Sequence, residues 1–203
     1  MPDMEFDAFY PVPVRVVSSQ FWTPVEVAIR AAQLLVVDHR TRVLDVGSGV
    51  GKLCVIGALT TGASFTGIEH RSHLVDVARE HATRMQASGA KFIHGRFHVL
   101  SWTEFDAVYF YNPFHENLYS LSEHLDDTVE VSHARFRFDI ELAQGLLAAA
   151  KIGTRAVTYH GFGGRMPKGY TLFSSEQRGS DRLQLWLKTY NARHDPWASH
   201  IWR

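Results

Sequence analysis

The sequence Asp45-Val-Gly-Ser-Gly-Val-Gly51 constrains the fold more than any other part of this chain. It continues the apolar run Val43-Leu44, and a helical pattern begins directly after it at Lys52. Three alternate glycines let a backbone turn sharply at the end of a buried strand and come close to a ligand, with which a Cβ would collide. The motif therefore predicts a strand, a ligand-binding loop and a helix, in that order.

Short β-rich runs alternate with helical patterns from residue 41 onward. Before them, a capping box at Thr23-Pro24-Val25-Glu26 predicts a helix to about Val36. We expect strands at 42–46, 64–69, 91–94, 107–111 and 154–159, with helices at 52–59, 72–85 and 138–150. Such alternation implies right-handed crossovers and a parallel sheet. The expected fold is therefore α/β, with a doubly wound, mostly parallel seven-stranded sheet.

The last two of these seven strands, at 170–173 and 182–188, are separated only by a polar turn at 174–180. Because a hairpin cannot join parallel neighbours, the sheet should end in an antiparallel C-terminal hairpin strand. The long irregular stretch 114–137 exceeds ordinary loop lengths and follows a strand end, which favours a functional role. We expect residues 1–203 to form a single domain, with 1–40 as an N-terminal helical cap and 112–137 as a substrate-side insertion.

Composition points to a soluble cytoplasmic protein. The chain has 203 residues, 45% hydrophobic and 21% charged, which is enough for one compact core. Its single cysteine, Cys54, cannot form an internal disulfide, and its acidic start is unlike a signal peptide. No apolar run approaches the roughly 18 residues of a membrane helix, so no membrane partner is expected.

The charges balance overall but not locally. Twenty-one basic residues against 21 acidic ones leave no positive field to attract nucleic acid. Residues 101–150 nevertheless carry a balance of −7, and residues 151–203 a balance of +6. These segments either pair with each other, or form an acidic rim for a cationic substrate or a basic rim for phosphate.

Asp45 and Glu69 indicate which ligand the glycine loop binds. The spacing Gly-x-Gly-x-Gly differs from the Gly-x-Gly-x-x-Gly of dinucleotide sites. Asp45 would repel a pyrophosphate but attract a ligand with an ammonium group, such as S-adenosylmethionine. Glu69 ends the next strand, where an acid can accept both hydroxyls of a ribose. Nicotinamide sites use the same acid, so a nicotinamide-dependent oxidoreductase stays an alternative that the glycine spacing and Asp45 disfavour.

Asn112-Pro113-Phe114 follows the strand expected at 107–111. In a doubly wound sheet, the carboxyl ends of the central strands line the ligand crevice. The side-chain oxygen of Asn112 and the carbonyl of Pro113 could accept hydrogen bonds from a substrate amine and orient its lone pair, while Phe114 forms a wall. The alternative is an Asx-Pro turn that only closes a strand.

On these motifs the chain resembles the class I S-adenosylmethionine-dependent methyltransferases over about residues 20–190, and most closely the non-SET histone-lysine methyltransferase family. The segment 45–51 is similar to that family's Asp-Leu-Gly-Ser-Gly-Val-Gly, 67–69 to its Gly-Val-Glu, 95–97 to its Gly-Asp-Phe and 112–114 to its Asn-Asn-Phe. The resemblance implies a Rossmann-like methyltransferase fold, with Phe97 stacked on adenine and Asn112 beside the transferred methyl group.

Three departures from that family affect the substrate and adenine sites. Arg96 stands where the family has an Asp that accepts from the adenine amino group, so adenine recognition must differ or use the backbone. Pro113 makes the segment 112–114 more similar to the Asn-Pro-Pro-Phe/Tyr motif of methyltransferases acting on adenine bases or glutamine side chains. The segment 21–24, Phe-Trp-Thr-Pro, is similar to a Phe-Tyr-Thr-Pro segment of adenine-N6 DNA methyltransferases.

We therefore expect a methyltransferase that moves a methyl group from S-adenosylmethionine to a nitrogen of a lysine-like protein side chain or a small amine. The alternatives are a nucleic-acid adenine-N6 or glutamine-N5 methyltransferase, and a non-catalytic nucleoside-binding module. Nucleic acid is the less expected partner, because the fold leaves only 1–22 and the acidic stretch 114–137 for the substrate. The histidines show no zinc signature, and no metal site is expected. The candidate cofactor residues are Asp45, Gly47, Ser48, Gly49, Gly51, Glu69, His70 and Phe97, and the candidate catalytic residues are Asn112, Pro113 and Phe114.

Overall fold

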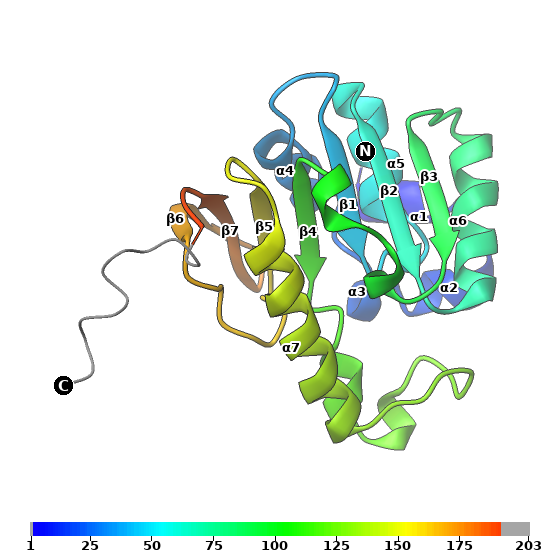
Figure 1. Cartoon of the computed structure of the whole chain (residues 1–203). Helices are drawn as coiled ribbons and strands as arrows, with labels where there is room; N and C mark the ends of the chain where they lie inside the picture. The colour runs from blue at the N-terminus through cyan, green and yellow to red at the C-terminus, as the bar shows by residue number, and fades with distance from the viewer. Residues whose placement is uncertain (1, 192–203) are drawn as a thin grey trace.

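A seven-stranded sheet forms the centre of the computed structural model, which describes residues 2–191 (Figure 1). Its strand order is β3-β2-β1-β4-β5-β7-β6. The strands are β1 (Arg42–Val46), β2 (Ser64–Glu69), β3 (Ala90–His94), β4 (Ala107–Tyr111), β5 (Arg155–Tyr159), β6 (Tyr170–Arg178) and β7 (Asp181–Lys188). The first five are parallel, and β7 pairs antiparallel with both β5 and β6. The expected fold class is thus confirmed. Met1 and residues 192–203 belong to the expected domain but lie outside the described residues. The +6 balance, counted over residues 151–203, therefore includes charges that the structure does not describe.

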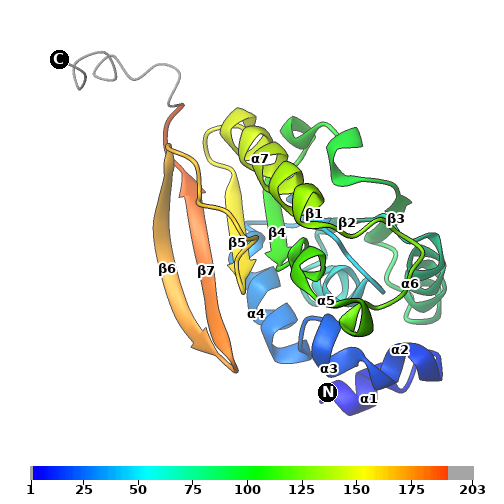
Figure 2. The ribbon, with the colours of Figure 1, turned by 90° about the horizontal axis from the view of Figure 1, so that it is seen from below.

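Helices cover both faces of the sheet (Figure 2). One face carries α4 (Val25–Leu35), α5 (Lys52–Thr61) and α6 (Ser72–Arg84), and the other carries α7 (His133–Ala149) with the short 3-10 helices η1 (Phe97–Val99) and η2 (Trp102–Glu104). Successive residues of β1 enter opposite cores: Val43 packs with the first group and Leu44 with the second. Burial on both faces explains why the central strands are continuously apolar.

The N-terminal residues form three short helices, α1 (Asp3–Asp7), α2 (Val12–Val16) and α3 (Ser18–Phe21), which pack against the glycine loop. Lys52, the first residue of α5, has a side chain only 3% exposed and forms ion pairs with Asp3 and Asp7. The Tyr10 hydroxyl donates to the carbonyl of Val50 at 3.4 Å. These contacts hold the N-terminal helices against the start of α5.

The capping box expected at Thr23 is wrong. Helix α4 begins at Val25, and no side chain of its own caps it. The Thr23 hydroxyl instead lies 3.3 Å from that of Tyr109 on β4, and the Val25 N–H donates to the Asp3 carboxylate at 2.9 Å. Partners distant in sequence thus replace the local cap that the pattern suggested.

Helix α7 begins five residues before the expected position. Ser132 caps it by accepting from the Arg135 N–H at 3.1 Å, and its own N–H donates to Asn117 at 3.1 Å. The irregular segment therefore ends at residue 132, and it contains η3 (His115–Leu118) and η4 (Leu121–Glu123). It lies beyond the carboxyl ends of the parallel strands, at the bottom of Figure 1.

The polar turn expected at 174–180 is also wrong. Strand β6 extends to Arg178, with a bulge near Leu172, and the turn consists of Gly179 and Ser180 alone. Gly179 adopts a left-handed φ of +51°, which a tight two-residue turn requires. The serines and glutamine of this segment can lie in a strand because β6 is at the edge of the sheet. No helix within residues 2–191 has the length and apolar character needed to cross a membrane.

Candidate active site

A cavity of about 240 Å³ opens where the parallel strands end. The loops after β1, β2, β3 and β4 line it, together with residues from α3 and α7. It brings together eight of the residues expected from the sequence, namely Gly47, Gly49, Glu69, His70, Phe97, Asn112, Pro113 and Phe114. Asp45 and Ser48 line a smaller adjoining cavity, and Gly51 lines neither. The cavity is thus assembled at the ends of all five parallel strands, with His160 contributed from the end of β5.

The three loop glycines all have left-handed φ angles, of +73°, +52° and +77° for Gly47, Gly49 and Gly51. A Cβ on Gly47 would lie 2.9 Å from the Pro113 Cβ, and one on Gly49 would lie 2.5 Å from the Trp22 ring. The glycines therefore let other parts of the protein pack on the loop. This reason differs from the collision with a ligand that the sequence suggested.

Glu69 is held in place by two backbone groups. Its carboxylate accepts from the Gly49 N–H at 3.0 Å and from the Arg71 N–H at 2.9 Å, and its side chain is buried. The acid therefore ties the glycine loop to the end of β2. Each carboxylate oxygen has a second lone pair, so Glu69 can still accept from hydroxyl groups in the cavity.

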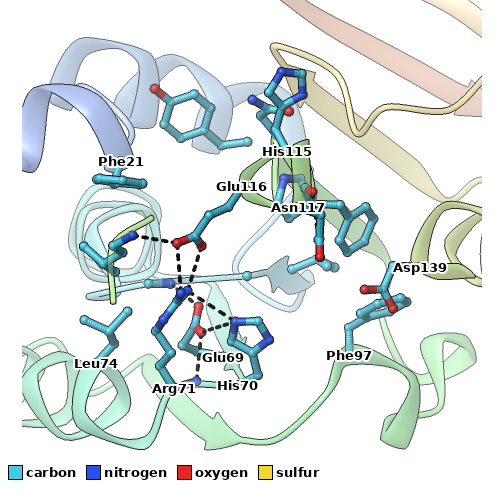
Figure 3. Close-up of a pocket in the computed structure, with 18 of the residues that line it drawn as sticks. Phe21, Glu69, His70, Arg71, Leu74, Phe97, His115, Glu116, Asn117 and Asp139 are labelled. Atoms are coloured by element: carbon cyan, nitrogen blue, oxygen red, sulfur yellow. Dashed lines mark hydrogen bonds and ion pairs between the residues drawn. The ribbon is translucent and has the colours of Figure 1, made fainter. Parts of the chain in front are cut away.

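Arg71 fastens the segment after β4 to the loop after β2 (Figure 3). Its guanidinium, 5% exposed, donates twice to Glu116 at 2.9 Å and once to Asp126 at 2.9 Å. Glu116 also accepts from the Leu125 N–H at 2.7 Å. This cluster was not predicted from the sequence, where its only local signal is a basic residue two positions after Glu69.

The same cluster shows how part of the charge asymmetry is neutralised. Glu116 and Asp126 from the acidic segment pair with Arg71 of the loop between β2 and α6. Asp106 does pair with Lys151 of the basic segment, at 3.1 Å. Pairing between the two segments is therefore only partial.

His70 lies beside the arginine cluster. Its Nε2 is 3.3 Å from a guanidinium nitrogen of Arg71 and 3.6 Å from the Glu69 carboxylate. Burial lowers the pKa of this imidazole, and the nearby Glu69 carboxylate opposes the shift. A neutral ring is therefore favoured, and it can donate or accept a hydrogen bond within the cavity.

Asn112 and His160 combine unusual backbone geometry with a place in the cavity wall. Both are non-glycine residues with left-handed φ angles, of +46° and +56°, and they follow the neighbouring strands β4 and β5. The Asn112 N–H donates to the Gly161 carbonyl at 3.0 Å, which joins the two strand ends. Strained backbone of this kind gathers at functional sites.

Aromatic rings line the same cavity as Asn112. The rings of Tyr111 and His160 are 5.6 Å apart, and those of His115 and Tyr119 are 5.5 Å apart. All four residues line the cavity, as does Phe21 from α3. This half of the cavity therefore presents several flat surfaces to a substrate.

Phe97 follows β3 and is mostly buried, with its ring 5.1 Å from that of Phe114. Asp139 from α7 also lines this part of the cavity, and Figure 3 shows it at the same end as Phe97. No pattern in the sequence indicates that Asp139 faces the site. Within the part of the chain that the structure describes, no three His, Cys, Asp or Glu side chains gather as metal ligands would.

Asp45 should make the stability of the protein depend on pH. Burial raises the pKa of its carboxyl from 3.8 to about 7, although the Cys54 thiol, which donates to it at 3.4 Å, opposes the shift. Because the folded state holds this proton more tightly than the unfolded chain, its stabilising effect is complete below about pH 4 and is lost as the pH rises through about 7. The loss is at most about 1.4 kcal/mol per pH unit.

Urea unfolding of the protein and of Asp45→Asn at pH 5 and pH 8 measures this effect. The variant cannot ionise at position 45, so its free energy of unfolding should fall less between the two pH values. Equal falls in the two proteins would contradict the raised pKa.

The topology, the glycine loop and the acid at the end of β2 define a nucleoside-binding α/β domain of the class I methyltransferase type. Residues 38–134 match the family model of a methyltransferase domain. The chain therefore contains a methyltransferase domain and is an enzyme of the class that uses S-adenosylmethionine. No curated protein sequence matches it significantly.

Solved structures share the fold. An RNA methyltransferase from Salinibacter ruber in complex with S-adenosyl-L-homocysteine matches 85% of this chain and 97% of its own, with 23% identity and a TM-score of 0.64. TrmN from Thermus thermophilus matches 82% of this chain and 49% of its own, with 18% identity and a TM-score of 0.56. The mitomycin 7-O-methyltransferase MmcR matches 81% of this chain and 54% of its own, with 15% identity and a TM-score of 0.56. At these identities the matches show a shared fold, and they do not support the histone-lysine family in particular.

Proposed function

We propose that this enzyme transfers the methyl group of S-adenosylmethionine to a planar nitrogen, and that the acceptor is the exocyclic amine of a base in RNA. The observation that carries the proposal is the position of Asn112, held in a left-handed conformation at the end of β4 among aromatic rings. Oxygens of Asn112 and Pro113 can accept both hydrogens of a planar amine, and the rings can stack on its base.

A lysine-like acceptor, which the sequence favoured, has less support. An ammonium group prefers a free carboxylate beside it, but Glu116, the lining acid of the same segment as Asn112, already accepts from Arg71 through both oxygens and from Leu125 through one. The Salinibacter protein is named as an RNA methyltransferase, which makes RNA the first substrate class to test. A glutamine amide is also planar, and the assay below distinguishes it.

The cofactor fits the groups that line the site. Glu69 can accept from the ribose hydroxyls. We propose that Asp45 and the glycine loop hold the amino-acid end and that Phe97 contacts the adenine. When bound, the cofactor supplies an activated methyl group, so the protein needs mainly to bind and align the acceptor and to exclude water.

The test is methylation of a cell extract with cofactor labelled in the methyl group. Ribonuclease should release the label from the macromolecular fraction, and nucleoside chromatography should place it on a methylated base. Release by protease alone would contradict an RNA acceptor, and amino-acid analysis would then separate lysine from glutamine. Heat-denatured enzyme is the control for non-enzymatic labelling.

Replacing Glu69 by Gln should weaken the binding of S-adenosyl-L-homocysteine about 10- to 100-fold, because hydrogen bonds to a charged acceptor contribute about 1.5–3 kcal/mol. The amide keeps the size of the side chain and can still accept from one of the two backbone N–H groups. Titration calorimetry measures the affinity, and a thermal melt checks the fold. Glu80→Gln, on the exposed surface of α6, is the matched control. Unchanged affinity in Glu69→Gln would rule out the ribose role.

A further inference from the structure

Asp139 is a buried acid in the cavity to which the proposed reaction gives no role. It lies on α7 and is 6% exposed. It lines the cavity with Phe97, and Figure 3 shows the two side chains at the same end of the cavity. Burying a carboxylate carries a large desolvation cost, so this position calls for specific partners.

The partner that the structure gives it is Arg135, one helical turn earlier. The guanidinium donates to both oxygens of Asp139, at 2.8 and 2.6 Å. The start of α7 is itself fixed, because Ser132 caps the Arg135 N–H and binds Asn117 of the segment after β4. The carboxylate therefore has a defined direction, and each oxygen keeps a lone pair that the bidentate contact does not use.

The other acids that line this cavity each hold a loop in place, and Glu69 is in addition proposed to bind the ribose. Glu69 holds the backbone N–H groups of Gly49 and Arg71, and Glu116 holds the Arg71 side chain and the Leu125 N–H. Among the described residues, Asp139 is the acid in the cavity lining that forms no hydrogen bond to a loop, since its partner Arg135 lies on the same helix. Its carboxylate is therefore available to accept a hydrogen bond from a ligand at this end of the cavity.

An adenine base carries a hydrogen-bond donor that could bind this carboxylate. In the proposed binding mode the ribose lies at Glu69 and the adenine at Phe97, which is the end of the cavity that Asp139 also lines. The exocyclic amino group of adenine is a donor, and the side chain of Arg96 in that loop can only donate. We infer that Asp139 accepts a hydrogen bond from the adenine amino group, and that it makes the site select adenine over purines with an oxygen at that position. This inference rests on the cofactor of the proposed function.

The test compares S-adenosyl-L-homocysteine with S-inosyl-L-homocysteine, which differ at the 6-substituent of the purine and in the proton that the inosine base carries on N1. In the inosine compound a carbonyl oxygen replaces the amino group and would face the carboxylate. Calorimetry on the unmodified protein should give an affinity about 10- to 100-fold higher for the adenosine compound. Equal affinities would overturn the inference without any variant, and binding of neither compound would overturn the cofactor assignment as well.

The variant Asp139→Asn tests whether this residue causes the preference for the adenosine compound. The amide keeps the shape of the side chain, but it can turn its NH₂ toward either ligand, so the ratio of the two affinities should fall to within about threefold of one. Glu141→Gln on the exposed side of α7 should keep the original ratio. A purely structural role for Asp139 would weaken both ligands equally and keep the ratio, and that result would overturn the inference while leaving the proposed function intact.

Discussion

Asn112→Ala should lower the rate of methyl transfer at saturating cofactor about 100-fold or more, while the affinity for S-adenosyl-L-homocysteine stays within about threefold. The expected loss reflects alignment, because misplacing a reacting group by about 1 Å can cost about two orders of magnitude in rate. Asn112 lies in the cavity wall at the end of β4, whereas the proposed cofactor contacts come from the ends of β1, β2 and β3. Single-turnover assays with labelled cofactor measure the rate, and calorimetry measures the affinity.

Asn112→Gly separates the amide from the backbone conformation. The left-handed φ of +46° is strained for alanine by about 1–2 kcal/mol but suits glycine. If the amide orients the acceptor, both variants should be slow. A fast glycine variant would show that only the backbone path matters, and a fast alanine variant would place the acceptor elsewhere in the cavity.

The parallel part of the sheet could be predicted because its signals are local. Val43 and Leu44 are buried on opposite faces, so the strand reads as a continuous apolar run, and three glycines mark its end. Parallel topology then brings strand ends to one edge, which is why Glu69 and Asn112 could be placed in one crevice from their positions alone.

The sequence predictions were wrong or incomplete where a side chain binds a partner far away in the chain. Thr23 has the pattern of an N-cap, but its hydroxyl meets Tyr109, 86 residues away. The Arg71 cluster depends on Glu116 and Asp126, 45 and 55 residues further along the chain. Asp139 could not be assigned to the site either, because the position of the expected helix did not show which side of α7 faces the cavity. Hydrophobic periodicity does not record pairings of this kind.

Lys52→Met should destabilise the protein by about 3–5 kcal/mol, because removing one partner of a buried ion pair leaves the other charge buried and uncompensated. The Lys52 side chain is almost fully buried, and its Nζ lies 2.8 Å from the Asp7 carboxylate. Asp7 would keep only the Ser18 hydroxyl, which donates to it at 2.6 Å. Urea unfolding followed by circular dichroism measures the change.

Two controls define the source of that loss. Lys151→Met removes an exposed ion pair with Asp106 and should cost less than about 1 kcal/mol. The double variant Lys52→Met/Asp7→Asn should recover part of the loss, since the orphaned charge is gone. A loss below about 1 kcal/mol in Lys52→Met would mean that the ion pair does not hold the N-terminal helices. Trp22 directly follows those helices, and its ring packs against Gly49 of the glycine loop. Weakening the helices should therefore also lower the affinity for S-adenosyl-L-homocysteine.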